Sequence, residues 1–388
     1  MDFLGETLKW WDKWLGGKEN DVLNAPLISA YIEEGMRPTS KVERVGGRFV
    51  ALEDEGDLEA RGYFLHPYKL VRGERSKEFI PICTPQAHGL LAGEWMGAGV
   101  LGESPCDQRM DDGMAIIFES EILKEDMDIL GFPRLRIKLA SDKPKAMLFA
   151  QLSECREDGF VQRVSYGVLN LALSEDKSRF VPLRADEFIE RELRLDACGH
   201  RFARGSRIRL SLANTFFPMF WPMPYRSTLK VDLSCSEFIL PLFKGEDSAV
   251  NLQPQSAPKT PLTLLKKGRV DRKISYDILS DTWTCVTDGV GGGVFGEGVY
   301  RFDAVDVLVW HNLKRKLSIK NDDPLSAKYT IWQTMKIGRE GEMMQADIVL
   351  TQTSDEEAFF LRGRMRVREN GREIFVKKYD EKIKRICH

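Results

Sequence analysis

The sequence has no long hydrophobic run, little net charge and no closely paired cysteines, and each lack excludes a class of protein. No apolar stretch approaches the roughly 18–20 residues that span a bilayer. The 388 residues carry a formal net charge of −2, which provides no basic field for nucleic acid. The seven cysteines are scattered without a CxxC pair, which favours neither a disulfide framework nor a zinc site. We therefore expect no membrane span, no nucleic-acid partner, and reduced thiols in a cytoplasm.

The sequence also lacks the motifs of common catalytic centres. An α/β-type serine hydrolase needs G-x-S-x-G at a strand-to-helix turn, and this motif is absent. Its nearest approach, residues 102–106 (GESPC), contains Pro105, which removes a backbone N–H where an oxyanion hole needs one. We expect a surface turn there. No histidine stands at a recognisable spacing from a nucleophile and a carboxylate, so we expect five surface or packing histidines: His66, His88, His200, His311 and His388.

Two acidic stretches and one glycine-rich stretch are the remaining candidates for a bound ion or phosphate. Residues 107–112 and 125–128 lack the spacing of an EF-hand, and we expect solvated loops. The glycines of 291–298 are followed by no Lys-Ser/Thr pair and lie in no βαβ unit, so a hairpin tip is the better interpretation. We predict no catalytic residue, no cofactor and no metal ligand in this chain.

The first residues predict an apolar helix. Large apolar side chains crowd residues 2–15, and Gly16-Gly17 is typical of a helix end. They are Phe3, Leu4, Leu8, Trp10, Trp11, Trp14 and Leu15. Burying each side chain of this size contributes roughly 1.5–3 kcal/mol, so the helix needs a surface to cover. We expect that surface to lie on polypeptide upstream of this sequence.

Most of the remaining chain predicts β-structure. Apolar and polar residues alternate in 134–139, 207–212 and 229–233, as in half-buried antiparallel strands. The fold class expected is mainly β, with a jelly-roll sandwich followed by a smaller antiparallel β-domain. Pro254, Pro258 and Pro261 mark a linker between the two. In the last third, Asn370-Gly371 is the strongest hairpin signal, because both residues accept a positive φ.

One aromatic loop stands out in the expected sandwich. Phe216, Phe217, Phe220 and Trp221 are interrupted by prolines in the segment FFPMFWPMP. Such a loop can stack on a sugar or another ligand, plug the end of the sandwich, or dock on another domain. The prolines make it rigid, and we favour plugging or docking.

Several segments, in order, resemble the C-terminal part of the CocE/NonD hydrolases, the family of Xaa-Pro dipeptidyl-peptidases and acyl esterases. They are ETLKWWDKWLGGKEN, CDQRMDDGMAIIFESEIL, LGFPRLRIKLASDKPKAMLFAQLSE, VSYGVLNLA, DACGHRFARGSRIRLSLANTFFPMFWPMP and TLKVDLS. The resemblance implies a remnant of an α/β-hydrolase domain at 1–38, including a short helix and strand. It further implies a jelly roll at 39–245, a linker at 246–262 and an antiparallel β-domain at 263–388.

The resemblance also implies what this chain does not contain. In the family the catalytic serine, aspartate and histidine precede the tryptophan-rich helix, so no catalytic position carries over to any residue here. We expect the non-catalytic portion of a serine hydrolase, inactive alone, that associates with a separate α/β-hydrolase half, or with itself, through Phe3, Leu8, Trp11 and Trp14. The alternative is a stand-alone β-sandwich module that binds a carbohydrate or peptide.

Overall fold

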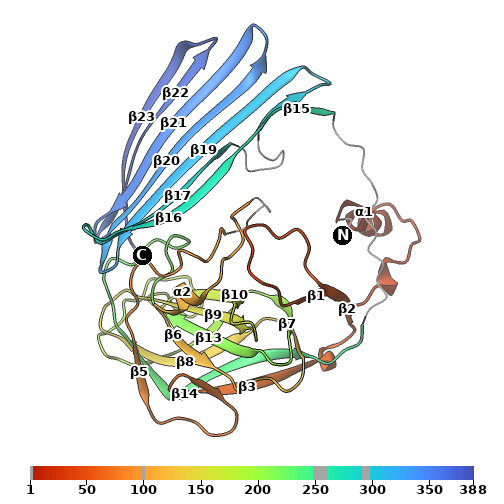
Figure 1. The fold of residues 1–388 in the computed structure, drawn as a ribbon. Coiled ribbons are helices and arrows are strands. Elements are labelled where there is room, and N and C mark those ends of the chain that lie inside the picture. Colours follow the sequence, from red (N-terminus) through yellow and green to blue (C-terminus); the bar gives the residue numbers. More distant parts are fainter. Residues whose placement is uncertain (1–2, 96, 98–100, 248–260, 291–297) are drawn as a thin grey trace.

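The protein is described by a computed structural model at residues 3–95, 97, 101–247, 261–290 and 298–388. Strands dominate these ranges and form two sheets, so the prediction of a mainly β chain is confirmed (Figure 1). Helical segments are few and short: α1 (Phe3–Trp14), α2 (Arg109–Asp112) and the 3-10 turns Val22–Asn24 and Glu55–Asp57. Within the described ranges no helix has the length and apolar character needed to cross a bilayer.

The first sheet folds into a sandwich. Its strands are β1 (Ile28–Glu34), β2 (Gly47–Leu52), β3 (Leu58–His66), β4 (Lys69–Val71), β5 (Phe79–Ile82), β6 (Ile116–Glu119), β7 (Met127–Gly131), β8 (Arg134–Ser141), β9 (Met147–Cys155), β10 (Val161–Asn170), β11 (Ile189–Arg194), β12 (Cys198–Phe202), β13 (Arg207–Ala213) and β14 (Leu229–Phe243). One layer has the order β10-β9-β13-β6. The other is built around β14, which pairs with β3, β5, β7 and β8. A single parallel pair, Lys69 with Glu119, joins the layers at one edge.

The core of the sandwich lies between these layers. Alternating residues of β8 (Leu135, Ile137, Leu139) are fully buried against Leu148 and Leu152 of β9. Strand β9 is buried on both faces, because its other side lies under the aromatic loop, where Phe149 stacks on a loop phenylalanine. Apolar burial of roughly 1.5–3 kcal/mol per large side chain therefore stabilises both sides of this strand.

The first described residues, up to Glu34, form one strand inside the sandwich sheet and one helix outside it. Strand β1 pairs antiparallel with β2 and parallel with β12, where Glu33 faces His200, so it is part of the sandwich sheet. Helix α1 instead has no buried residue, and it lies beside the sandwich (Figure 1). The apolar stripe predicted for α1 is thus present and exposed to water.

The second sheet is an antiparallel meander. Its strands are β15 (Leu262–Lys267), β16 (Val270–Asp277), β17 (Thr282–Val290), β18 (Gly298–Phe302), β19 (Val307–Lys320), β20 (Asp323–Arg339), β21 (Glu342–Ser354), β22 (Ala358–Glu369) and β23 (Arg372–Lys384). Asn370 and Gly371 join β22 to β23 with φ values of 48° and 83°, which confirms the predicted hairpin. Most of the linker expected at 246–262 and the glycines 291–297 lie outside the described residues.

The two faces of this C-terminal sheet differ in chemistry. We call the face that carries Arg315, which packs on the sandwich at one end, the inner face, and the opposite one the outer face. The inner face is mainly apolar, with Ile331, Met335, Ile337, Met344, Ile348, Leu350, Met365, Val367 and Phe375, and it carries charged groups at its margins, namely Arg339, Glu369, Lys377 and Glu381. The outer face is rich in cations: Lys314, Lys316, Lys336, Arg362, Arg364, Arg366, Arg368, Lys378 and Lys382.

Candidate functional site

The aromatic loop lies where the sandwich meets the C-terminal sheet. Phe216 stacks on Phe149 with ring centroids 3.9 Å apart, and it is buried. Phe217 joins a buried cluster that includes Cys285 and Ile319 of the C-terminal sheet. The Trp221 indole N–H donates a 2.9 Å hydrogen bond to the Ser354 hydroxyl. The loop therefore both plugs the sandwich and docks on the second sheet, which confirms the favoured interpretation.

Charged groups reinforce this seam between the two sheets. The Glu94 carboxylate accepts two hydrogen bonds from the Arg315 guanidinium, at 3.0 and 3.1 Å, and lies 3.6 Å from Arg272. Burial alone would lower the pKa of Arg315, but Glu94 outweighs burial and raises it. Arg272 also donates to the Gly102 carbonyl. The turn at 102–106, the nearest approach to a nucleophile motif, is thus a turn as expected, and it is held against the C-terminal sheet.

The last residues of the sequence form a third contact between the sandwich and the C-terminal sheet. The buried Arg385 guanidinium donates to the Ser354 hydroxyl at 3.1 Å and to the Pro222 carbonyl at 2.6 Å. Burial lowers the pKa of Arg385 to about 10. Lys145 of the sandwich donates to the Arg385 carbonyl at 2.8 Å. A pocket of about 560 Å³ opens beside these groups and also touches Tyr225. Sequence reasoning had no signal for this cation pair, because its partners are mostly backbone carbonyls.

Four of the five histidines have hydrogen-bond partners, and the fifth, His388, packs on Phe359 with its buried Nδ1 unpartnered. His88 is buried, its Nδ1 lies 2.7 Å from the Thr215 carbonyl, and burial lowers its pKa to about 4. His200 lies 3.1 Å from the buried Glu154 carboxylate. His66 contacts a backbone carbonyl and His311 the Gln333 amide. In the part of the chain that the structure describes, no histidine hydrogen-bonds to a serine or cysteine side chain, so no histidine there is arranged to activate a nucleophile.

One acidic stretch differs from its prediction. We expected a solvated loop at 107–112, but Asp111 and Asp112 are buried in α2. Asp112 accepts a 2.6 Å hydrogen bond from the Ser211 hydroxyl and pairs with Arg209. Asp111 accepts the Leu91 amide at 3.1 Å, and burial raises its pKa to about 7. The solvated-loop prediction was wrong here because both carboxylates find internal donors, and α2 is thereby fixed to the sandwich.

The thiols and the potential metal ligands are the remaining candidates. All seven cysteines are free. Burial raises the pKa of Cys155 and of Cys198 to about 12, so both are held as thiols rather than reactive thiolates. Across the described ranges, no three His, Cys, Asp or Glu side chains gather as a metal-binding group would.

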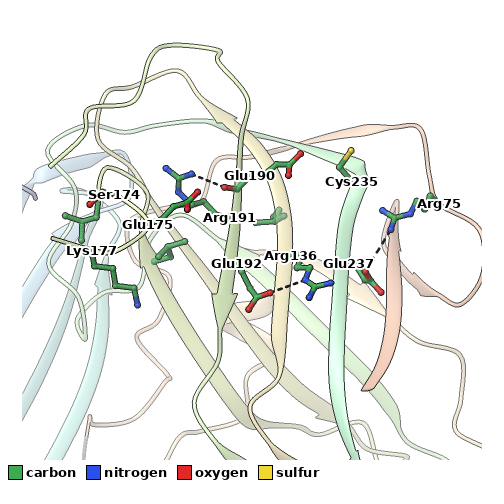
Figure 2. A pocket seen from close by; sticks show the side chains of 13 residues that line it. Arg75, Arg136, Ser174, Glu175, Lys177, Glu190, Arg191, Glu192, Cys235 and Glu237 are labelled. Atoms are coloured by element: carbon green, nitrogen blue, oxygen red, sulfur yellow. Dashed lines mark hydrogen bonds and ion pairs between the residues drawn. The ribbon is translucent and has the colours of Figure 1, made fainter. Parts of the chain in front are cut away.

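A pocket of about 530 Å³ lies on the outer surface of the sandwich, over β8, β11 and β14 (Figure 2). Two ion pairs line it: Arg136 donates to Glu192 at 3.0 Å, and Arg75 lies 4.0 Å from Glu237. Cys235 at its rim is exposed. Figure 2 shows these pairs along the pocket wall rather than converging on one point. The pocket is therefore a charged surface groove in which no acid, base and nucleophile converge on one point.

Taken residue by residue, the fold and its contacts define a β-sandwich with an attached antiparallel sheet. The family model described as "X-Pro dipeptidyl-peptidase C-terminal non-catalytic domain" matches residues 53–260, which is more than half of the sequence. The chain belongs to this family. The match confirms the resemblance drawn from the ordered sequence segments.

Solved structures show a more distant likeness. A CocE/NonD family hydrolase from Staphylococcus aureus shares 14% identity at a TM-score of 0.43, over 62% of this chain and 45% of that one. An aminopeptidase from a marine sediment Thaumarchaeota archaeon shares 16% sequence identity at a TM-score of 0.45. The likeness covers 61% of this chain and 44% of that one. An alpha-amino acid ester hydrolase shares 19% sequence identity at a TM-score of 0.40. The likeness covers 47% of this chain and 36% of that one. The match thus spans under half of each of these proteins. No curated protein matches the chain significantly.

Proposed function

We propose that this chain is the non-catalytic C-terminal section of a serine hydrolase of the Xaa-Pro dipeptidyl-peptidase or CocE/NonD type. Its role is to support an α/β-hydrolase polypeptide that carries out dipeptidyl-peptidase or acyl-ester hydrolysis. The match of residues 53–260 to a domain described as non-catalytic carries the proposal. The bonding of His66, His88, His200 and His311 supports it, since their rings are engaged with carbonyls, a carboxylate or an amide.

Helix α1 supplies the contact with the hydrolase polypeptide in this proposal. Phe3, Leu8, Trp11 and Trp14 are 71%, 64%, 50% and 53% exposed, although each is large enough to drive docking when buried. Trp10 and Trp14 pack on each other with ring centroids 5.8 Å apart, which stiffens the stripe. An apolar stripe of this kind fits the apolar surface of a folded domain.

The alternative of a stand-alone carbohydrate or peptide module has less support. Its binding surface would be the aromatic loop, but Phe216 and Phe217 are buried and the Trp221 indole is bonded to Ser354. The loop therefore presents no open aromatic platform. We further place the protein in the cytoplasm, a proposal supported by its seven unpaired thiols.

An activity assay tests the catalytic part of this proposal. The purified chain is given p-nitrophenyl esters and Xaa-Pro p-nitroanilides, with and without a serine-directed inhibitor. We expect no turnover above the buffer blank. Turnover that the inhibitor abolishes would show a working nucleophile within the chain and would refute the proposal.

A co-purification experiment tests the docking role of α1. The chain is co-expressed with an α/β-hydrolase polypeptide encoded beside it, as wild type and as the double variant Leu8→Ser/Trp11→Ser. Lys9→Ser is the matched control, because Lys9 lies on the polar side of the same helix and pairs with Glu6. We expect the wild type and the control to retain the hydrolase and the double variant to lose it. Equal recovery with all three forms would exclude α1 as the contact.

A further inference from the structure

The inner face of the C-terminal sheet is mainly apolar, and the residues that the structure describes leave much of it uncovered. One row across it joins Met335 to Ala346, Val367 and Phe375 on successive strands. Met335 and Phe375 are 46% and 45% exposed, and Ile337 beside this row is 53% exposed. A sheet with one apolar face is stable when that face is buried against another layer. Here the sandwich covers only the end of the inner face that carries Arg315 and Ile319.

The covered and uncovered parts are continuous. At the seam, Ile319 and Cys285 are buried against Phe217 of the sandwich. The same strands extend past the seam with the same alternation, so the inner face keeps its apolar character while the covering layer stops. The uncovered part is therefore an extension of an interface that already exists within the chain.

The solvent-accessible surface area of the chain also indicates an uncovered interface. The chain exposes 21978 Å² at a mass of 44.3 kDa. A compact monomer of this mass exposes about 15,500 Å². The excess of about 6,500 Å² includes the exposed apolar side chains of α1 and of the inner face. It is large enough to supply one side of an obligate homodimer interface, which buries about 2,000–5,000 Å² over both partners.

The chemistry of the sheet selects the kind of partner. Beyond the seam the inner face is mainly apolar, and charged groups such as Glu369 and Lys377 lie at its margins, so its partner needs a largely apolar and extended surface. Most of the cations lie on the outer face, and β23, an edge strand, carries Lys377, Lys378 and Lys382, which oppose pairing along that edge. The remaining mode of association is face to face, with the spacing of about 10 Å at which two sheets pack.

We propose that the occupant of the inner face is the inner face of a second copy of this chain. A two-fold axis makes such a contact self-complementary, since each copy presents the same apolar rows to the other. The two C-terminal sheets then form the two layers of one sandwich, and both α1 helices stay outside it. This pairing goes beyond the proposed hydrolase contact and does not depend on it.

Sedimentation velocity on the purified full chain tests the pairing over a range of concentrations. We expect a wild-type dimer of twice 44.3 kDa. Met335→Glu and Ile337→Glu should each raise the dimer dissociation constant by about 100-fold or more, because the dimer would bury two uncompensated carboxylates. Both residues are half exposed in a single chain, so the fold should survive, and circular dichroism checks this for each variant.

Matched controls make every outcome decisive. Val349→Glu adds the same charge at a 43% exposed site on the outer face of the adjacent strand, and it should sediment as a dimer. Leu8→Ser/Trp11→Ser should also remain dimeric. A monomeric wild type overturns the pairing, whether or not it carries a bound lipid or another protein. A dimer that Met335→Glu and Ile337→Glu leave intact, or that only the α1 variant dissociates, overturns it as well.

Discussion

Replacing Glu94 with glutamine should loosen the C-terminal sheet from the sandwich. The carboxylate is the shared partner of Arg315 and Arg272, whose side chains are 25% and 15% exposed. Removing one partner of a fully buried ion pair costs about 3–5 kcal/mol, because the other charge stays desolvated. The seam is only partly buried, and water screens part of that cost. We therefore expect Glu94→Gln to destabilise the docked sheet by about 2 kcal/mol.

Urea denaturation followed by two signals measures this loss. Two of the eight tryptophans, Trp221 and Trp283, pack at the seam, so part of the change in tryptophan fluorescence reports on it, while far-ultraviolet circular dichroism reports on all strands. We expect the fluorescence transition of Glu94→Gln to move to lower urea ahead of the circular dichroism transition. The two signals separate because the sheet undocks before the sandwich core unfolds.

The control for Glu94 is an exposed ion pair of the same kind. Asp380 pairs with Arg362 on the outer face, with side chains 75% and 69% exposed. Asp380→Asn should change the free energy of unfolding by less than about 0.5 kcal/mol. If Glu94→Gln stays equally close to wild type, or if Asp380→Asn costs more than Glu94→Gln, the reasoning that the seam depends on a partly buried carboxylate is refuted.

Further predictions concern the buried Asp111 and the turn of the last hairpin. The pKa of Asp111 is raised from 3.8 in the unfolded chain to about 7 in the folded one. Between these two pH values the folded state holds a proton that the unfolded state has lost. The free energy of unfolding therefore falls as pH rises through this range, by up to about 4 kcal/mol. Asp111→Asn should therefore match wild type at pH 4 and exceed it in urea denaturation at pH 8.5; parallel pH profiles would contradict this. Gly371→Ala should cost roughly 1 kcal/mol, because φ is 83° and a Cβ there meets nothing within 4 Å, so only backbone strain is added. Gly363→Ala should cost more in the same denaturation assay, since its Cβ would lie 2.7 Å from the Val349 carbonyl oxygen; an equal cost at both sites would show that this close contact relaxes freely.

The strands were predictable because their pattern is local. Period-two alternation in 134–139 and 207–212 corresponds to β8 and β13, and Asn370-Gly371 corresponds to the turn between β22 and β23. The dual role of the aromatic loop followed from its composition, since large rings among prolines form a rigid apolar plug. In each case the residues that decide the structure are neighbours in the sequence.

The seam and the buried acids were not predictable because their partners are distant. Glu94 and Arg315 are 221 residues apart, and nothing in either segment indicates the other. Asp112 is buried because Ser211 and Arg209 of β13 face it, 97 to 99 residues later. A run of charged residues predicts a solvated loop, because its sequence does not show which hydrogen-bond donors surround it in the fold. Tertiary placement therefore decided these positions.

The connectivity of the two sheets has a kinetic consequence. Each strand from β19 to β23 pairs with its neighbour in sequence, so the C-terminal meander can zip together hairpin by hairpin. The sandwich instead pairs β3 with β14 and β1 with β12, and it must close long loops before these contacts form. We infer that closure of the sandwich limits the folding rate, and that the meander, which follows the sandwich in the chain, docks onto it in a late step.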